Sequence, residues 1–433
     1  MNAAPKTLHV LQPLVISAAE AHQKSVIQYD KTGVVTLTHP VLQATIGIES
    51  VKIPLERQFP LVFATLADLG KALSSSANSP ILEGKSLRDE YDAEFQTYLV
   101  ALQSAQDAGE VEPDYGSYVY DVVTGNLFLV APERWHRTAL VTSTGMLLTD
   151  KKKELNWHQV RTLLERKVVG FIGASVGGNL IEGVMRELRP KCAKVADPDW
   201  IETNNLNRLE RGSIEYLAKS RASRSDFKNA YDLQRWNKAE VAAYRQQMVD
   251  PYAEWYVYSE GLTEENIERF FLGDGKHEPK IDLVVEEADD MPLKVLVRKV
   301  ARKLGIPVLM LSDFGHCAFV QFWDFAADRE QSLGVDCSEA ELDAAVATAM
   351  TSGNRADIFH VIELICGPGY ARAEFKQWIE GEGEQPTSSL PQSGATALIS
   401  GGIGGKLVGQ YFLGHEVPRY RMYDFQTGEV KTK

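Results

Sequence analysis

Hydrophobic and polar positions follow two different patterns along the chain, and the pattern changes near residue 150. Before that point the apolar runs are short. Segments 32–42 and 44–55 predict strands, and 87–109 has the spacing of a helix that ends at a glycine. Residues 115–132 alternate apolar and polar positions around a T-G-N turn, which predicts a β-hairpin. We therefore expect residues 1–150 to form a small α+β domain of unknown role.

From about residue 155, apolar strand-like runs alternate with helical spacing. Strands are predicted at 167–173, 193–199, 254–261, 281–289 and 306–313, and helices at 176–188, 262–273 and 292–305. This alternation builds a parallel sheet through βαβ crossovers. The expected fold class is α/β, with a mostly parallel Rossmann-like sheet that carries helices on both faces and occupies residues 151–433.

Two polar stretches interrupt this alternation, one after Asp197 and one at residues 380–394. The first is too long for a plain crossover connection. Residues 395–414 predict a glycine-rich helix packed on the sheet domain, and 417–430 predict a closing hairpin or edge pair. The short apolar length of that helix, together with Lys406, argues against a membrane span.

The net charge and the cysteine spacing of the chain disfavour several kinds of binding partner and site. With 46 Lys and Arg against 59 Asp and Glu, the net charge is −13, which disfavours nucleic acid and anionic membranes as partners. The four cysteines (Cys192, Cys317, Cys337, Cys366) form no C-x-x-C pair, which argues against a disulfide framework and a zinc ribbon. The N-terminus lacks the pattern of a signal peptide, so we expect a cytoplasmic protein.

A glycine-containing turn follows the strand at 167–173. Gly173, Gly177 and Gly178 lie where a nucleotide phosphate can approach backbone N–H groups at a helix N-terminus. Ser175 stands at the third position, so the loop departs from G-x-G-x-x-G. The same glycines can also serve only to pack the helix tightly on the strand. Both interpretations stay open.

Polar residues after the next strand extend this candidate site. Asp197 ends that strand and opens the sequence D-P-D, which closes at Asp199; it can hold a ribose or act as a turn aspartate. Arg208 on the following loop and Lys238 at a helix start suit nucleotidyl transfer, because charge builds on triphosphate oxygens during that reaction. The alternative is that both are solvated surface charges.

Acidic residues gather where the strand at 281–289 ends, in the sequence E-E-A-D-D. Ligands bind at the carboxyl edge of an open α/β sheet, and closely spaced carboxylates suit Mg²⁺. The alternative is that Asp289 and Asp290 cap the helix that begins near Pro292. One of the two can cap while the other binds metal.

The order of these motifs resembles the ThiF/MoeB superfamily, the adenylating domain of ubiquitin-activating-like enzymes. The resemblance covers about residues 155–433 and rests on G-A-S-V-G-G, D-P-D, N-L-N-R, K-A, E-E-A-D-D and G-I-P-V-L-M. It implies an enzyme that binds ATP and Mg²⁺, adenylates a carboxylate such as the C-terminus of a ubiquitin-like protein or a peptide, and releases pyrophosphate. It also implies a homodimer.

The resemblance assigns roles to individual residues. It places Gly173 and Gly178 on the phosphate loop with Ser175 and Gly177, Asp197 with Asp199 at the ribose, Asn205 and Arg208 on the phosphates, Lys238 on the leaving pyrophosphate, and Asp289 on Mg²⁺. Within the superfamily, the chain looks most like a bacterial subgroup that carries its own N-terminal extension.

The sequence also departs from the family pattern. Leu209 stands where a glutamine usually follows N-L-N-R, and the 30 residues from Arg208 to Lys238 indicate an insertion near 212–232. The stretch 141–150 lacks the arginine that relatives donate to a partner's ATP. The remaining candidates for that role are Arg134, Arg137 and Arg161.

Three further hypotheses remain open at this stage. Cys317 or Cys366 can serve as a thiol acceptor, although both lie among apolar residues. The chain can be an inactive ThiF-like binding or scaffold protein, which the departures favour. It can also be an NAD-dependent oxidoreductase, which the Rossmann-like outline favours and the two cations disfavour.

Overall fold

The computed structural model describes residues 13–17, 20–21, 26–60, 117–130, 157–209, 237–335, 337–367 and 392–432. The chain divides into two compact units. The first comprises residues 1–145 with 227–232 and 247–252, and the second comprises the remainder. The predicted helix at 87–109, the insertion near 212–232 and the polar segment 380–391 lie outside the described residues.

The first unit contains two small sheets. One has the order β1-β6-β7-β5, and the other is antiparallel with the order β2-β3-β4. The strands are β1 (Leu14–Ser17), β2 (Ile27–Tyr29), β3 (Val35–Thr38), β4 (Ser50–Ile53), β5 (Gln58–Pro60), β6 (Ser117–Asp121) and β7 (Asn126–Val130). The predicted hairpin is confirmed, because β6 and β7 pair antiparallel across a tight turn in which Gly125 has φ 74°.

The strand predictions at 32–42 and 44–55 are only partly right. Strands β3 and β4 lie within these segments, but the residues between them form helix α2 (Pro40–Ile46). His39 caps this helix through its Nδ1, which accepts from the Val41 amide at 3.2 Å. Pro40 then suits the first turn, and Gly47 ends the helix at φ 72°. The capping residues at its two ends therefore favour a helix in this segment, although several of its residues are β-branched and favour strands.

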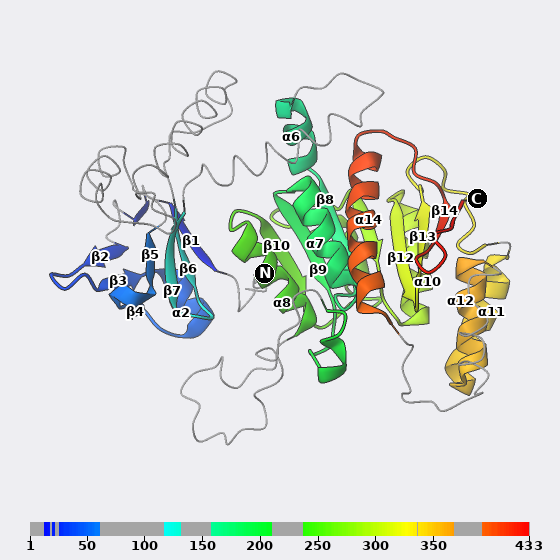
Figure 1. The fold of residues 1–433 in the computed structure, drawn as a ribbon, viewed down its shortest axis with the longest axis horizontal. Coiled ribbons are helices and arrows are strands. Elements are labelled where there is room, and N and C mark those ends of the chain that lie inside the picture. The colour runs from blue at the N-terminus through cyan, green and yellow to red at the C-terminus, as the bar shows by residue number, and fades with distance from the viewer. Residues whose placement is uncertain are drawn as a thin grey trace. The chain divides into compact units, whose positions relative to one another are not determined.

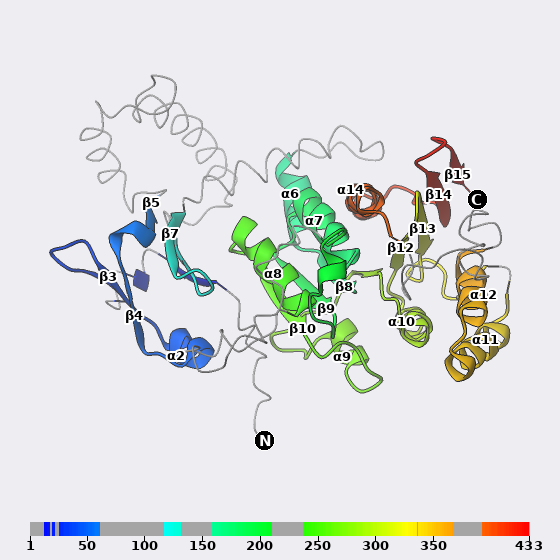
Figure 2. The ribbon, with the colours of Figure 1, turned by 60° about the horizontal axis from the view of Figure 1, so that its bottom comes forward.

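An eight-stranded sheet forms the centre of the second unit, in the order β10-β9-β8-β11-β12-β13-β14-β15. The first five strands run parallel and the last three antiparallel. The strands are β8 (Val168–Ile172), β9 (Cys192–Ala196), β10 (Glu254–Tyr258), β11 (Leu283–Glu286), β12 (Val308–Phe314), β13 (Cys317–Trp323), β14 (Tyr420–Asp424) and β15 (Val430–Thr432). The predicted α/β class is confirmed, and the predicted C-terminal edge pair is β14 with β15 (Figures 1 and 2).

Helices cover both faces of this sheet (Figures 1 and 2). One face carries α6 (Trp157–Glu165), α7 (Gly177–Leu188), α8 (Lys238–Val249) and α14 (Gly394–Phe412), and the other carries α9 (Ile267–Leu272), α10 (Met291–Leu304), α11 (Glu339–Ser352) and α12 (Arg355–Cys366). Strand β8 shows how this arises, since Val169 and Phe171 pack into one core while Val168 and Ile172 pack into the other. Burial on both faces explains why its sequence is apolar throughout.

The sequence analysis did not predict α11 and α12. Both begin with capping signals: Ser338 and Glu341 form a capping box, and the Asn354 side chain accepts from the Asp357 amide. The pattern S-x-x-E before an apolar run could have located α11. This pair matters because α12 lines a cavity described below.

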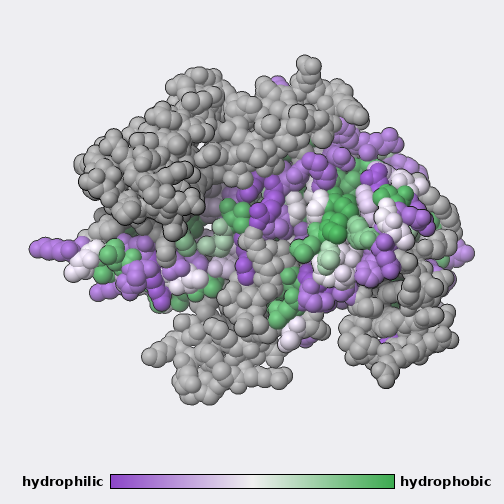
Figure 3. Space-filling model, viewed as in Figure 1, coloured by the Kyte–Doolittle hydropathy of each residue, from purple (hydrophilic) through white to green (hydrophobic). Residues whose placement is uncertain are grey.

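Glycines set the close packing of α7 against α14. A Cβ added to Gly183 would collide with the Gly401 carbonyl oxygen, and one added to Gly405 would collide with the Gly183 carbonyl oxygen. The predicted glycine-rich helix packed on the sheet domain is thus confirmed as α14. Its outward face is apolar, with Leu398 64% and Ile399 44% exposed (Figure 3). In the described part of the chain, no helix is both long and apolar enough to span a bilayer.

We expect Gly183→Ala to lower the free energy of unfolding by about 1–3 kcal/mol, because the added methyl group overpacks a backbone contact. Urea unfolding followed by tryptophan fluorescence measures this change. Gly402→Ala is the matched control, since its Cβ would meet nothing within 4 Å and alanine favours helices by up to about 1 kcal/mol. Equal stability of Gly183→Ala and the native chain would contradict the packing argument.

Candidate functional site

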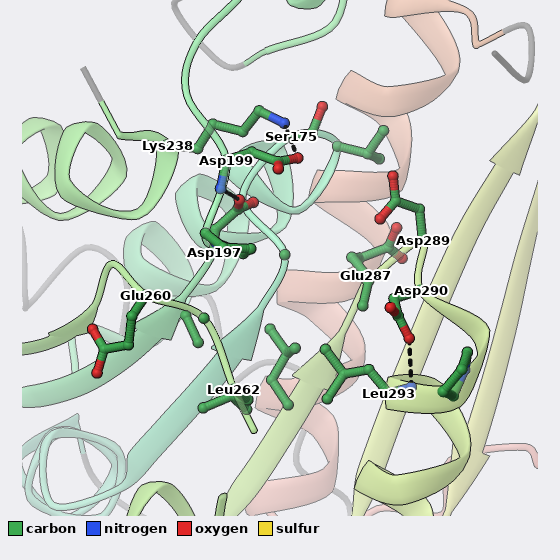
Figure 4. Close-up of a pocket in the computed structure, with 18 of the residues that line it drawn as sticks. Ser175, Asp197, Asp199, Lys238, Glu260, Leu262, Glu287, Asp289, Asp290 and Leu293 are labelled. Atoms are coloured by element: carbon green, nitrogen blue, oxygen red, sulfur yellow. Dashed lines mark hydrogen bonds and ion pairs between the residues drawn. The ribbon is translucent and has the colours of Figure 1, made fainter. Parts of the chain in front are cut away.

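A pocket of about 560 Å³ lies at the carboxyl ends of β8, β9, β10 and β11 (Figure 4). This is the edge where ligands bind in open α/β sheets, and the volume is typical of small-molecule sites. Seven of the predicted site residues line it: Gly173, Ser175, Asp197, Asp199, Arg208, Lys238 and Asp289. Three others, Gly177, Gly178 and Asn205, are not among its lining residues.

The loop after β8 brings backbone and one hydroxyl group to the pocket. Gly173 has φ 88°, and a Cβ there would lie 2.8 Å from the Glu287 backbone, so only glycine fits between the ends of β8 and β11. Ser175 lines the pocket, and its buried Oγ has no hydrogen-bond partner in the part of the chain described. Gly177 and Gly178 form the first turn of α7 behind it. An acceptor such as a phosphate oxygen would satisfy both the hydroxyl group and this helix start.

Asp197 joins the ends of two strands. Its Oδ2 accepts from the Ala174 amide at 2.7 Å and its Oδ1 from the Asp199 amide at 2.9 Å. Burial raises the pKa of Asp197, and the charge of Lys238 opposes that rise. Asp197 therefore acts as the turn aspartate that the D-P-D sequence allowed, while its side chain also faces the pocket (Figure 4).

Lys238 begins α8, as predicted, and its Nζ lies 2.8 Å from the Asp199 carboxylate. Its side chain is buried, so it is not a solvated surface charge. The neighbouring Asn237, which the sequence analysis did not single out, donates from its amide to the carbonyl oxygens of Asp197 and Asp199. The Asn237 Oδ1 also accepts from the Glu240 amide and caps α8. The pattern N-x-x-E before the helix could have revealed this role.

Asn205 ends a short 3₁₀ turn after β9 and Arg208 follows that turn, but the two side chains have different surroundings. The Asn205 Oδ1 accepts from the Glu202 amide at 2.9 Å and caps its own turn, so its side-chain oxygen is engaged there, and Asn205 is not among the residues that line the pocket. Arg208 lines the pocket. Burial lowers the pKa of its guanidinium, and the charges of Asp313 and Asp289 oppose that effect. The Arg208 backbone is fixed by the Asn179 amide, which donates to its carbonyl oxygen at 2.7 Å.

The acids after β11 divide into different roles. Glu286 is fully buried and pairs with Lys294 at 2.9 Å and Arg298 at 3.1 Å, so it belongs to the core and not to a metal site. Asp290 caps α10 by accepting from the Leu293 amide at 2.7 Å. Asp289 is exposed and lines the pocket (Figure 4).

Asp290 thus caps α10, as the sequence allowed, and both Asp289 and Asp290 line the pocket. Within the described ranges, no group of three or more His, Cys, Asp or Glu side chains is arranged to hold a metal by itself. A single carboxylate still fits Mg²⁺, because this ion often takes one or two carboxylates together with substrate phosphates.

Two further acids were not proposed as ligands by the sequence analysis: Glu287, which lines the pocket, and Asp313, which lines a smaller cavity. Burial raises the pKa of both, and that of Asp313 reaches about 6. The Oε1 of Glu287 and the Oδ2 of Asp313 have no hydrogen-bond partner among the residues described. Both residues line the smaller cavity.

We expect Asp313→Asn to stabilise the protein at pH 8 by up to about 3 kcal/mol. The folded-state pKa is about 6 and the unfolded value 3.8, so the native chain binds more protons between these values and loses stability as pH rises through them. Asparagine keeps the shape without the charge. Urea unfolding at pH 4 and pH 8 should show the native chain weakening by more than the variant. Parallel pH profiles would contradict this expectation.

The two candidate thiols are buried. Cys317 begins β13 and Cys366 ends α12, each 2% exposed, and burial raises the pKa of Cys366 to about 12. A reactive cysteine needs an accessible thiolate, so these surroundings do not favour a nucleophilic role. Arg134 and Arg137, the candidates for an arginine donated across a dimer, lie outside the described residues, as does the side chain of Arg161.

Comparison with known proteins gives remote likenesses. No family model matches the chain. An uncharacterized protein of Mycobacterium tuberculosis, MT1398, is 26% identical over 216 residues, which cover 50% of this chain and 26% of that protein. The chain therefore matches only about a quarter of the length of this curated relative.

Among solved structures, PaaA shares 14% identity over 70% of this chain and 84% of its own, with a TM-score of 0.46. The Escherichia coli protein MccB, crystallised with ATP, shares 14% identity over 67% of this chain and 70% of its own, with a TM-score of 0.43. At these identities and TM-scores, neither likeness bears on what this chain binds.

Proposed function

We propose that this chain is an adenylating enzyme that binds ATP with Mg²⁺ in the pocket at the carboxyl ends of β8–β11 and transfers AMP to a carboxylate. The observation that carries the proposal is the convergence of the Ser175 loop, Arg208, Lys238 and Asp289 on one pocket. The Ser175 Oγ, which has no hydrogen-bond partner among the described residues, and the start of α7 fit phosphate, and the buried Lys238 with the half-buried Arg208 supply positive charge for a triphosphate.

In this reaction a carboxylate oxygen forms a bond to the α-phosphorus. The bond from that phosphorus to the bridging oxygen breaks, and the electron pair leaves with pyrophosphate. Arg208 and Lys238 stabilise the charge that builds on the phosphate oxygens, and Lys238 does so by exchanging its Asp199 partner for phosphate. Asp289 holds Mg²⁺, which supplies further neutralisation of phosphate charge. Catalysis then consists of positioning and charge stabilisation.

The first test is a calorimetric titration of the purified protein with ATP and Mg²⁺, run beside NAD. We expect micromolar ATP binding and no NAD binding. NAD binding without ATP binding would overturn the proposal in favour of an oxidoreductase. ATP binding without carboxylate-dependent pyrophosphate exchange would favour a non-catalytic nucleotide-binding scaffold, for which the capping role of Asn205 is the supporting observation.

We expect Asp289→Ala to raise the Mg²⁺ concentration needed for half-maximal pyrophosphate exchange at least tenfold, because Asp289 is an exposed pocket carboxylate that the proposal assigns to the ion. A Mg²⁺ titration of exchange at fixed ATP measures this. Glu268→Ala is the control, since it removes an exposed carboxylate that does not line the pocket and leaves Asp289 and the cap of α10 in place. An unchanged Mg²⁺ requirement in folded Asp289→Ala would remove the metal assignment.

The resemblance to the ThiF/MoeB superfamily supports a protein or peptide C-terminus as the carboxylate and a homodimer as the assembly. Both stay proposals. Light scattering of the purified chain tests the dimer, and exchange assays with candidate carboxylates test the substrate.

A further inference from the structure

A second, smaller cavity opens beside the nucleotide pocket. Its volume is about 100 Å³, and it lies between β12, α10 and α12. Most of its wall is apolar, formed by Met291, Met310, Ile358, Ile362, Ile365 and Cys366. Glu287, Ala288, Asp289 and Gln392 line both this cavity and the nucleotide pocket, so the two spaces meet at the end of β11.

The volume of this smaller cavity, called the side cavity below, limits the size of the group that it can bind. A water molecule or a methylene group takes up about 30 Å³, so 100 Å³ holds about three or four carbon atoms. Side chains around it are largely buried in the core that α10 and α12 share with the sheet. Met291 and Met310 can adjust to the shape of a ligand, because their side chains are unbranched. The cavity therefore suits an aliphatic group of the size of a valine, leucine or isoleucine side chain.

Four charged residues also line this cavity: Glu287, Asp289, Lys294 and Asp313. Asp313, only 3% exposed, is the last residue but one of β12 and lines the cavity. Its Oδ1 accepts from the Gln392 amide at 3.3 Å, while its Oδ2 has no hydrogen-bond partner among the described residues. Lys294, the cation in the same wall, is committed to Glu286 at 2.9 Å. A buried carboxylate oxygen without a donor is costly, so a ligand N–H group would satisfy it.

We propose that the side cavity binds the aliphatic side chain of an α-amino acid unit, that Asp313 accepts from the nitrogen of this unit, and that its carboxylate projects into the nucleotide pocket. The proposal rests on the proposed function, since it names the class of carboxylate that is adenylated. An amino acid carries its nitrogen, side chain and carboxyl group on one carbon atom. One residue can therefore reach Asp313, the apolar wall and the shared border near Asp289 at the same time.

The nitrogen can belong to a free amino acid or to the last residue of a peptide, and the chemistry at Asp313 is the same. Binding is measured by calorimetry with L-leucine, N-acetylglycyl-L-leucine and 4-methylpentanoate, each with and without a non-hydrolysable ATP analogue. We expect leucine or the peptide to bind at least tenfold more tightly than 4-methylpentanoate, which lacks only the nitrogen. Leucine tests whether the site takes a free amino acid, and N-acetylglycyl-L-leucine tests whether it takes the last residue of a peptide. Equal binding of all three, or binding of none, would overturn the proposal.

Variants locate the binding in this cavity. Ile362→Ala enlarges the space and should shift the preference from leucine toward phenylalanine by about tenfold or more, since a single methylene in an apolar pocket is worth about 10-fold. Ile362→Val makes a smaller change in the same direction if the alanine variant does not fold. Val361→Ala is the matched control, because Val361 is buried on the same helix but does not line the cavity. An unchanged preference in folded Ile362 variants would overturn the proposal.

Asp313→Asn tests the recognition of nitrogen. We expect this variant to lose most of the preference for leucine over 4-methylpentanoate, and an undiminished preference would contradict the role of Asp313. The binding assay without nucleotide separates the two proposals. Leucine binding without ATP binding removes the adenylation proposal alone, whereas ATP binding and exchange with no aliphatic amino acid unit removes this inference alone.

Discussion

We expect Arg208→Ala to lower ATP-dependent pyrophosphate exchange at least 100-fold. Arg208 lines the nucleotide pocket, and its guanidinium is half-buried opposite Asp313 and Asp289, where its charge acts with little screening by water. The Asn179 side-chain amide donates to the Arg208 carbonyl oxygen, which holds the backbone from which the Arg208 side chain extends. Exchange of labelled pyrophosphate into ATP at saturating carboxylate measures the loss. Calorimetry should show weaker ATP binding in the same variant.

Two further variants separate the contribution of this arginine from general effects of charge. Arg186→Ala removes an exposed arginine of α7 that pairs with Glu182, outside the pocket lining, and should leave exchange unchanged. Arg208→Lys keeps the charge but loses the planar fork that binds phosphate oxygens in pairs, so we expect an intermediate rate. Activity of Arg208→Ala within a fewfold of the native chain would exclude Arg208 from the reaction.

The sheet and the position of the pocket could be predicted from the sequence because both depend on local pattern. The strands around Gly173, Asp197 and Asp289 are apolar runs buried on both faces, and their ends carry the polar residues. The rule that ligands bind at the carboxyl edge then places these ends around one site. Seven predicted residues line the pocket for this reason.

The remaining features depend on contacts that local pattern does not encode. Asn205 has the residue type of a ligand, but its side-chain oxygen is engaged by the Glu202 backbone amide nearby. Asp313 reads as the last residue of a strand, and no local pattern indicates that its side chain is only 3% exposed, in the wall of a cavity that α12 also lines. Similarly, the sequence E-E gives no sign that Glu286 turns into the core while Glu287 lies at the pocket border.

Glu286→Ala should lower the free energy of unfolding by about 3–5 kcal/mol. The Glu286 carboxylate is 0% exposed, and it holds Lys294 at 2.9 Å and Arg298 at 3.1 Å in the core between β11 and α10. Removing it leaves two buried cations without their counter-charge. Urea unfolding of the variant and the native chain measures the loss.

The exposed pair Lys303–Glu268, with the two side chains 69% and 55% exposed, provides the matched control for this prediction. Glu268→Ala should change stability by less than about 1 kcal/mol, because water screens that pair.

Since burial rather than pairing produces the large effect, replacing Glu286, Lys294 and Arg298 together by leucine and methionine should recover most of the stability lost in Glu286→Ala. A loss in Glu286→Ala no larger than in Glu268→Ala would contradict this reasoning.

The Glu286 carboxylate, besides stabilising the core, also contacts the turn that lines the pocket. The Glu286 Oε1 also accepts from the Ala288 amide at 2.8 Å, which fixes the turn that presents Glu287 and Asp289 to the pocket. We therefore expect the multiple apolar variant, although stable, to bind Mg²⁺ and ATP more weakly than the native chain. If it binds them as tightly, the turn holds its shape without Glu286, and the buried ion pairs serve the core alone.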